Sequence, residues 1–185
     1  MSNPFYDQGP LGQIANNLFL GWGYNFYRTE NQLRADDQLV RAKAAWLLGQ
    51  AAASVQVAEA DFRRDAFPPP TRANPYPDPE AVRAVQTLER LGRAIMAVEA
   101  RLQALPAPEQ DLMSLLYRQE AATLAGLVDH DTRMIGQAEL LRALVDHKAA
   151  PWLLENLAEV ELGLSALLAT LNDRVSLLFS GVPHP

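Results

Sequence analysis

The stretch WLLENLAEVELGLSALLATLNDRVSLLF, residues 152–179, decides the fold. Its large apolar residues recur at steps of three and four, which places them on one side of a helix, away from the acidic side chains. This spacing predicts a long helix that packs against other helices through a near-heptad seam. The seam consists of Leu153, Leu157, Val160, Leu164, Leu167, Leu171, Val175 and Leu178.

Proline residues mark where this helix and its neighbours begin and end. Pro151 precedes the seam, and the sequence leaves open whether it separates two helices or kinks one long helix. Residues 79–105 repeat the apolar pattern, with Asp78 as the expected N-cap and Pro79 in the first turn, where proline is tolerated. A further helix is therefore expected to follow the prolines that end this one.

The segment between these two helices predicts two shorter ones. Apolar residues keep helical spacing over about 108–129 and again over 132–148. Between them, Asp129-His130-Asp131 reads as a short break, with Asp131 as the cap of the second helix.

The first half of the chain predicts one long helix over about residues 30–66. Its main seam carries Ala44, Ala51 and Ala58 at intervals of seven, where small side chains allow another helix to approach closely. Leu39, Trp46 and Val57 form a second apolar strip, well away from the first on the helical wheel. Two interpretations stay open: the helix contacts neighbours on two sides, or the second strip faces another protein.

Six prolines fall within residues 68–79 and favour an extended polyproline II conformation. Twelve such residues span about 37 Å at 3.1 Å each, close to the length of a 26-residue helix. The segment can thus cross the whole bundle and set helix 79–105 parallel to helix 30–66, or form an ordinary surface loop. The expected fold is an all-α, elongated bundle of five or six helices with a long Pro-rich crossover loop, in a single domain over residues 1–185.

Residues 1–28 differ from the rest, since they are rich in aromatic side chains and uncharged between Asp7 and Arg28. They can form the first helix of the bundle, a surface for a protein partner or self-association, or an interfacial membrane helix. The last interpretation lacks the usual Lys and Arg of such helices. A partner interface would use Phe19, Trp22, Tyr24, Phe26 and Tyr27, together with Leu39, Trp46 and Val57.

Glu120 falls in the middle of the apolar face of its predicted helix. A buried carboxylate is costly unless it is paired or protonated. The structural explanation is an ion pair with an arginine of a neighbouring helix, for which Arg174 near a seam is a candidate, or a rotated helix that exposes Glu120. The functional alternative is a group that anchors a ligand or performs acid–base chemistry in a cavity of the bundle.

Few residues offer catalytic or metal-binding chemistry. The chain has no cysteine and three histidines, with His130 and His147 expected near helix ends and His184 in a flexible tail at 181–185. No Glu-x-x-His pair, phosphate-binding loop or zinc motif occurs, so we expect no metal and no cofactor. Whether the protein is an enzyme stays open, but the lack of a recognisable catalytic group of residues favours a protein that is not an enzyme.

The overall charge and composition restrict the kinds of partner and the cellular location that we expect. A net charge of −6 argues against nucleic acid, which needs basic residues to neutralise phosphates. No apolar run is long enough to span a membrane, and the N-terminus lacks the positive start of a signal peptide, so a cytoplasmic protein is expected. The abundance of alanine, proline and arginine over lysine is typical of a GC-rich bacterial genome.

The sequence as a whole favours a non-catalytic interaction or assembly protein: an adaptor, a subunit of a complex, or a self-associating scaffold. One alternative is a bundle that binds a small ligand around Glu120. The other is a peripheral membrane protein that attaches through residues 1–28.

Overall fold

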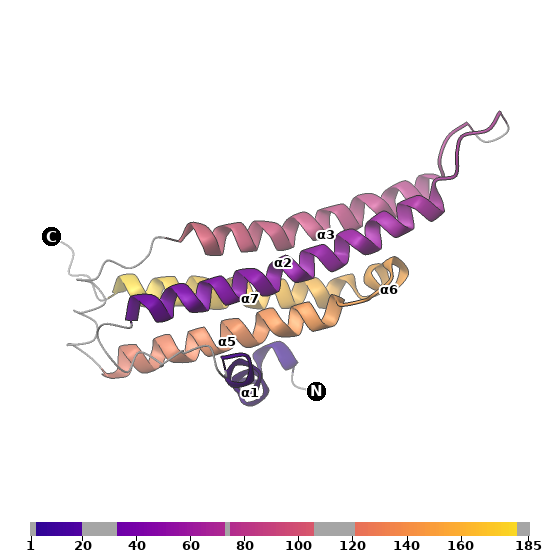
Figure 1. Cartoon of the computed structure of the whole chain (residues 1–185). Helices are drawn as coiled ribbons and strands as arrows, with labels where there is room; N and C mark the ends of the chain where they lie inside the picture. Colours follow the sequence, from indigo (N-terminus) through magenta and orange to yellow (C-terminus); the bar gives the residue numbers. More distant parts are fainter. Residues whose placement is uncertain (1–2, 20–32, 73–74, 106–120, 181–185) are drawn as a thin grey trace.

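The computed structural model describes residues 3–19, 33–72, 75–105 and 121–180, with only the backbone at 33–37, 121–125 and 178–180. Every regular element in these residues is helical, which confirms the predicted all-α bundle (Figure 1). The elements are η1 (Pro4–Tyr6), α1 (Gln8–Phe19), α2 (Leu33–Ala66), α3 (Pro79–Ala104), α5 (Ala121–Val145), α6 (Ala150–Glu155) and α7 (Leu157–Ser180).

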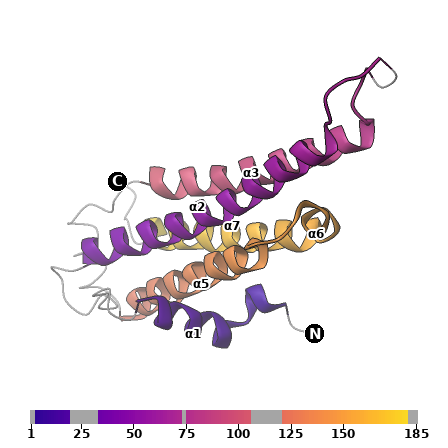
Figure 2. The same ribbon diagram turned by 45° about the vertical axis from the view of Figure 1, so that its right-hand side comes forward.

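The four long helices lie side by side and form the body of the molecule (Figures 1 and 2). α2 packs against α3 and α5, and α7 packs against the same two helices, so the four enclose one core. The short α6 lies at one end of the bundle, and α1 lies on the outside of α5. The shape is elongated, as the helix lengths predicted.

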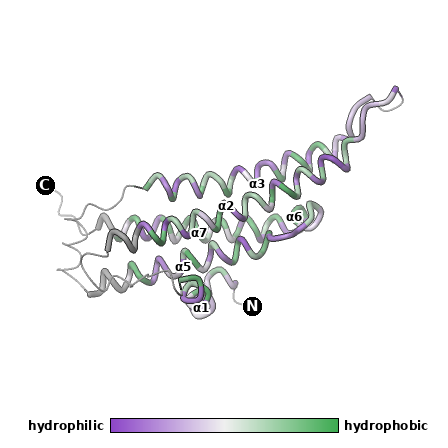
Figure 3. Tube along the Cα trace, in the orientation of Figure 1, coloured by the Kyte–Doolittle hydropathy of each residue, from purple (hydrophilic) through white to green (hydrophobic). Residues whose placement is uncertain are grey.

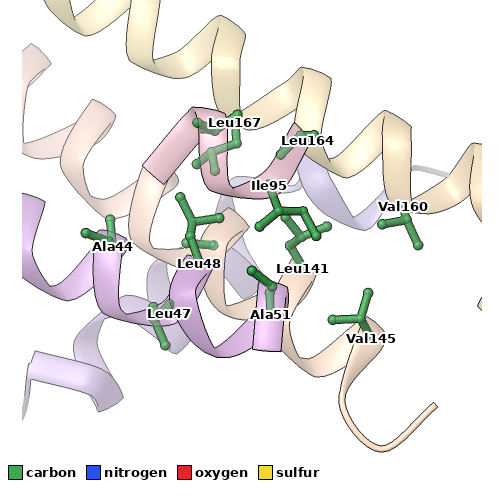
Figure 4. Packing of buried hydrophobic residues seen from close by; sticks show 14 of the residues in the cluster. Ala44, Leu47, Leu48, Ala51, Ile95, Leu141, Val145, Val160, Leu164 and Leu167 are labelled. Atoms are coloured by element: carbon green, nitrogen blue, oxygen red, sulfur yellow. The ribbon is translucent and has the colours of Figure 1, made fainter. Parts of the chain in front are cut away.

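Apolar side chains from all four long helices meet in the core (Figure 4). Ala44 and Ala51 of α2 are fully buried, and the small side chains let Ile95 of α3 and Leu141 of α5 approach. Along α3, apolar and polar residues alternate at helical spacing (Figure 3), which gives this helix one buried and one solvated face. Most described residues of the seams predicted for 30–66, 79–105 and 152–179 therefore lie in the core.

The Pro-rich segment does not cross the bundle, so the prediction of a long crossover loop is wrong. α2 and α3 form an antiparallel hairpin, as two contacts show. Arg63 near the end of α2 pairs with Glu89 in the first half of α3. At the opposite end, Arg41 Nη1 donates to the carbonyl oxygen of Leu105 at 2.6 Å. The chain between the two helices turns back beyond their ends (Figure 1).

The predicted helix break at residues 129–131 is also wrong. α5 runs without interruption from Ala121 to Val145, and Asp131 is a fully buried residue inside it instead of a cap. The predicted break near Pro151 is present, and the chain leaves the helical conformation at two points there. Pro151 lies in the first turn of α6, after α5 has ended, and Asn156 then separates α6 from α7 by donating its side-chain amide to the carbonyl of Trp152.

The N-terminal segment is attached to α5 and α7 through two glycines. A Cβ on Gly136 of α5 would lie 2.7 Å from the backbone oxygen of Leu11, so the backbones of α1 and α5 touch there. A Cβ on Gly163 of α7 would lie 2.6 Å from the ring of Phe5. The buried amide of Gln137 donates to the carbonyl oxygen of Phe5 at 3.0 Å, which fixes the register of η1.

Candidate docking face on helix α2

The second apolar strip predicted for the long N-terminal helix lies partly on the molecular surface. Trp46 is 53% exposed and Val57 is 61% exposed, whereas Leu39 is half-buried and packs against the core. The interpretation in which α2 contacts neighbours of its own bundle along this strip is therefore wrong for Trp46 and Val57. These two side chains lie on the outer surface of α2.

Smaller exposed residues connect Trp46 and Val57 into a continuous surface, which we call the outer strip. Its members recur at steps of three and four, carry no charge and are all exposed. They extend over about 27 Å of helix, at 1.5 Å per residue. The small members were not predicted from the sequence, although their spacing was the available signal. The outer strip consists of Ala42, Trp46, Gln50, Ala53, Val57 and Ala60.

Trp46 is held in place by a cation. The ammonium of Lys43 lies 4.4 Å from the centre of the indole ring, a distance at which the ring quadrupole attracts the charge. Lys43 is only 5% exposed, and this burial lowers its pKa, while the nearby carboxylate of Glu139 acts in the opposite direction. The indole is thus oriented before any partner arrives, which reduces the entropy lost on binding.

A groove opens beside Val57, between the last third of α2 and the turn from α5 to α6. Its volume is about 830 Å³, and its α2 side is lined by Ala53, Val57 and Phe62. The acidic Asp61 lies on the α2 edge, and the basic Lys148 lies on the edge formed by the α5–α6 turn. The lining of the groove therefore combines apolar side chains with charged side chains of both signs.

The turn that forms the far edge of this groove is braced by ion pairs. Arg142 binds Glu139 at 2.7 Å and Asp146 at 3.1 Å, and both carboxylates raise the pKa of Arg142. His147 follows with φ of 53°, the left-handed conformation that ends many helices. The edge is thus fixed relative to α5 before binding.

The aromatic N-terminal segment contributes its apolar face to the inside of the protein. Phe19, which we predicted as a partner-interface residue, is 7% exposed and belongs to the core, so that prediction is wrong. Leu11 and Ala15 on the same face are also buried. The other four predicted interface residues lie outside the described residues, namely Trp22, Tyr24, Phe26 and Tyr27.

The packing of the apolar face of α1 against α5 is relevant to the interpretation of residues 1–28 as an interfacial membrane helix. An interfacial helix needs a free apolar side to insert into lipid, and the described part of α1 has its apolar side covered by the bundle. In the described residues, no helix is long and apolar enough to cross a bilayer.

The strongest electrostatic feature of the interior is an ion pair between α5 and α7. Arg174 Nε lies 2.5 Å from Asp131 Oδ1, and both side chains are 1% exposed. The sequence made Arg174 a candidate partner of Glu120. The structure shows Asp131 bound to Arg174, while Glu120 lies outside the described residues. A buried pair of this kind serves the packing of two helices and lies away from the outer strip.

The two described histidines offer little catalytic geometry. His130 is half-buried inside α5 and not at a helix end as predicted, and its Nδ1 is buried without a hydrogen-bond partner. His147 extends into solvent, with Nε2 3.7 Å from Asp146. Within residues 3–19, 33–72, 75–105 and 121–180, no group of three His, Cys, Asp or Glu residues can hold a metal ion.

Comparison with known proteins leaves the geometry as the basis for function. No protein-family model, no curated protein and no solved structure matches this chain.

Proposed function

We propose that this protein is a non-catalytic helical interaction protein, an adaptor or a subunit of an assembly, which binds a protein partner through the outer strip of α2. One observation carries the proposal: Trp46 is half exposed, oriented by Lys43, and placed in an uncharged strip on the surface. Tryptophan is enriched among the residues that dominate binding energy at protein interfaces. A bacterial, cytoplasmic setting remains part of the proposal and rests on composition alone.

The shape of the surface around Trp46 supports a protein partner over a small ligand. One hollow lies beside Trp46, between α2 and α3, and the larger groove lies beside Val57 on the same helix. The two hollows lie beside the same exposed helix, one toward α3 and one toward the α5–α6 turn, and a helix laid along the outer strip can place side chains in both. A small ligand would occupy only one of these hollows and would leave the rest of the outer strip in water.

Site-specific photo-crosslinking in cells tests this proposal. A photoreactive amino acid at Gln50, between Trp46 and Val57, should give a covalent adduct of defined mass. The matched control carries the same group at Leu162, an exposed apolar residue of α7 with 43% exposure. An adduct from position 50 that is absent from position 162 supports the outer strip as the docking face. Equal labelling from both positions, or none from position 50, contradicts it.

A further inference from the structure

Met96 of α3 is an oxidisable residue on the surface of the hairpin that α2 and α3 form. It is 46% exposed, whereas Met134 of α5 is only 1% exposed and belongs to the core. Met1 and Met113 lie outside the described residues. Of the two described methionines, therefore, only Met96 is open to small molecules dissolved in the surrounding water.

A side chain of the neighbouring helix donates a hydrogen bond to the sulfur of Met96. Gln56 Nε2 lies 3.3 Å from Met96 Sδ, so this contact joins α2 to α3, which lie side by side (Figures 1 and 2). A thioether sulfur is a weak acceptor, while an amide N–H binds an oxygen atom more strongly. The amide of Gln56 is therefore placed beside an atom that becomes a strong acceptor once it carries an oxygen.

A hollow of about 310 Å³ lies between α2 and α3, and both Gln56 and Met96 line it. Its charged side chains bind one another, since Glu59 and Glu89 both pair with Arg63. Hydrogen peroxide is uncharged and does not compete for these ion pairs. The hollow therefore has room for this small oxidant and for the single oxygen atom that it transfers.

We propose that Met96 is a reversible oxidation site, which hydrogen peroxide converts to the sulfoxide, and that Gln56 holds the added oxygen. The lone pair of Sδ attacks one peroxide oxygen, so an S–O bond forms while the O–O bond breaks. The departing hydroxide takes the proton from the transferred oxygen and leaves as water. Sulfur loses two electrons in this step, and the peroxide gains them. A sulfoxide reductase reverses the step, because two thiols give up two electrons to form a disulfide and the oxygen leaves as water.

The two helices stay together when Met96 is oxidised. A sulfoxide is polar, so it disrupts an apolar core when it forms there. Met96 lies at the surface instead, where Gln56 and water can both bind the new oxygen. The core contacts of α3 come from other residues, such as Leu88, Leu91 and Ile95, which the oxidation leaves unchanged. The modification therefore changes the surface chemistry of the hairpin, and it requires no partner at the outer strip.

Timed exposure of the purified full chain to hydrogen peroxide, followed by peptide mass spectrometry, tests the selectivity. Cleavage after arginine places each of the four methionines in its own peptide. Met96 should be oxidised at least about tenfold faster than Met134, which reacts only when the core opens. The same exposure in urea is the control and should bring the two rates together, because unfolding exposes both residues. Similar rates in the folded protein, or an unreactive Met96, overturn the proposal.

The side-chain amide signal of Gln56 in the NMR spectrum tests the second half of the proposal. Oxidation should shift its protons downfield, because a sulfoxide oxygen accepts a hydrogen bond more strongly than a thioether sulfur. Gln103 is the matched control, since its amide donates to Glu99 on the same helix at 3.2 Å and should not move. Met96→Leu keeps an apolar side chain of similar volume but cannot be oxidised, so the shift should be absent from this variant. A Gln56 signal that stays in place in the wild type, or moves equally in Met96→Leu, overturns the role of Gln56.

Reversibility is tested on the oxidised protein while it remains folded. Sulfoxide reductases for the two sulfoxide epimers, supplied together with a dithiol, should return Met96 to the thioether, because its exposure gives the enzymes access. The Gln56 signal should then return to its original position. A Met96 sulfoxide that is reduced only after the chain is unfolded overturns the assignment of a reversible site.

Discussion

Asp131 and Arg174 form an ion pair from which water is almost completely excluded, since each side chain is 1% exposed. We expect Arg174→Met to lower the free energy of unfolding by about 3–5 kcal/mol, because it leaves a carboxylate buried without its cation. Urea denaturation followed by far-UV circular dichroism measures this change.

The double variant Asp131→Leu with Arg174→Met provides the control for that experiment. Replacing both members of a buried pair by apolar residues is often neutral or stabilising, so the double variant should recover most of the lost stability. A double variant as unstable as Arg174→Met alone would show that the uncompensated charge is not the cause.

His147 illustrates a second effect of a single residue. Its φ of 53° forces an L-residue with a Cβ into the left-handed region, although its side chain is 95% exposed and holds no buried contact. His147→Gly should therefore stabilise the protein by about 0.5–1 kcal/mol. His147→Ala keeps the Cβ and should change stability little. Thermal unfolding of both variants checks the difference, and an equal gain in both would contradict a backbone origin.

At the scale of single elements, the docking of α1 on α5 depends on Gly136. A methyl group there would overlap the backbone of Leu11 at 2.7 Å, and backbone cannot yield as a flexible side chain does. We expect Gly136→Ala to lift α1 from α5 and to cost about 1–3 kcal/mol. Hydrogen exchange should then lose protection in residues 8–19 more than in α2 and α3.

Gly12 is the matched control on the opposite side of the same contact. Its added Cβ would meet Thr132 at 3.7 Å, which is ordinary van der Waals distance. Gly12→Ala should leave α1 docked and gain up to about 1 kcal/mol from helix propensity. Loss of protection in both variants would mean that α1 is held by something other than the close approach at Gly136.

Periodicity predicted the long helices because each has a core-facing seam, as Leu88 and Ile95 show for α3. It placed a break in α5 because Asp131 resembled a cap. This charged residue is instead buried by contact with Arg174, 43 positions away, which no local pattern reveals. The outer strip was found only through its two large members, since alanines are common on both buried and exposed faces of helices.

The direction of α3 relative to α2 is a property of the whole molecule that sequence could not decide. Twelve extended residues are long enough to cross the bundle and equally able to turn back at its end. Contacts remote in sequence choose the second solution, such as the pairing of Arg63 with Glu89. The hairpin leaves the outer strip of α2 open, because α3 occupies a different side of the helix.

Removal of residues 1–19 separates the two roles that the sequence suggested for the N-terminal segment. Phe5, Leu11 and Phe19 bury their side chains against the bundle, so the deletion should lower the free energy of unfolding by about 2–4 kcal/mol, net of the ordering entropy of the segment. It should also uncover the part of α5 around Gly136, where α1 packs in the intact protein, and binding of a hydrophobic dye detects such exposure.

If the outer strip is the interface, the truncated protein should still give the partner adduct from Gln50 under conditions where it remains folded, because the outer strip lies on α2 and the deleted segment packs on α5 and α7. Trp46→Ala in the truncated background should then reduce the yield of that adduct. A truncated protein that stays as stable as the full chain, yet gives no adduct from Gln50, would return the interface to the N-terminal segment and reject the assignment to α2.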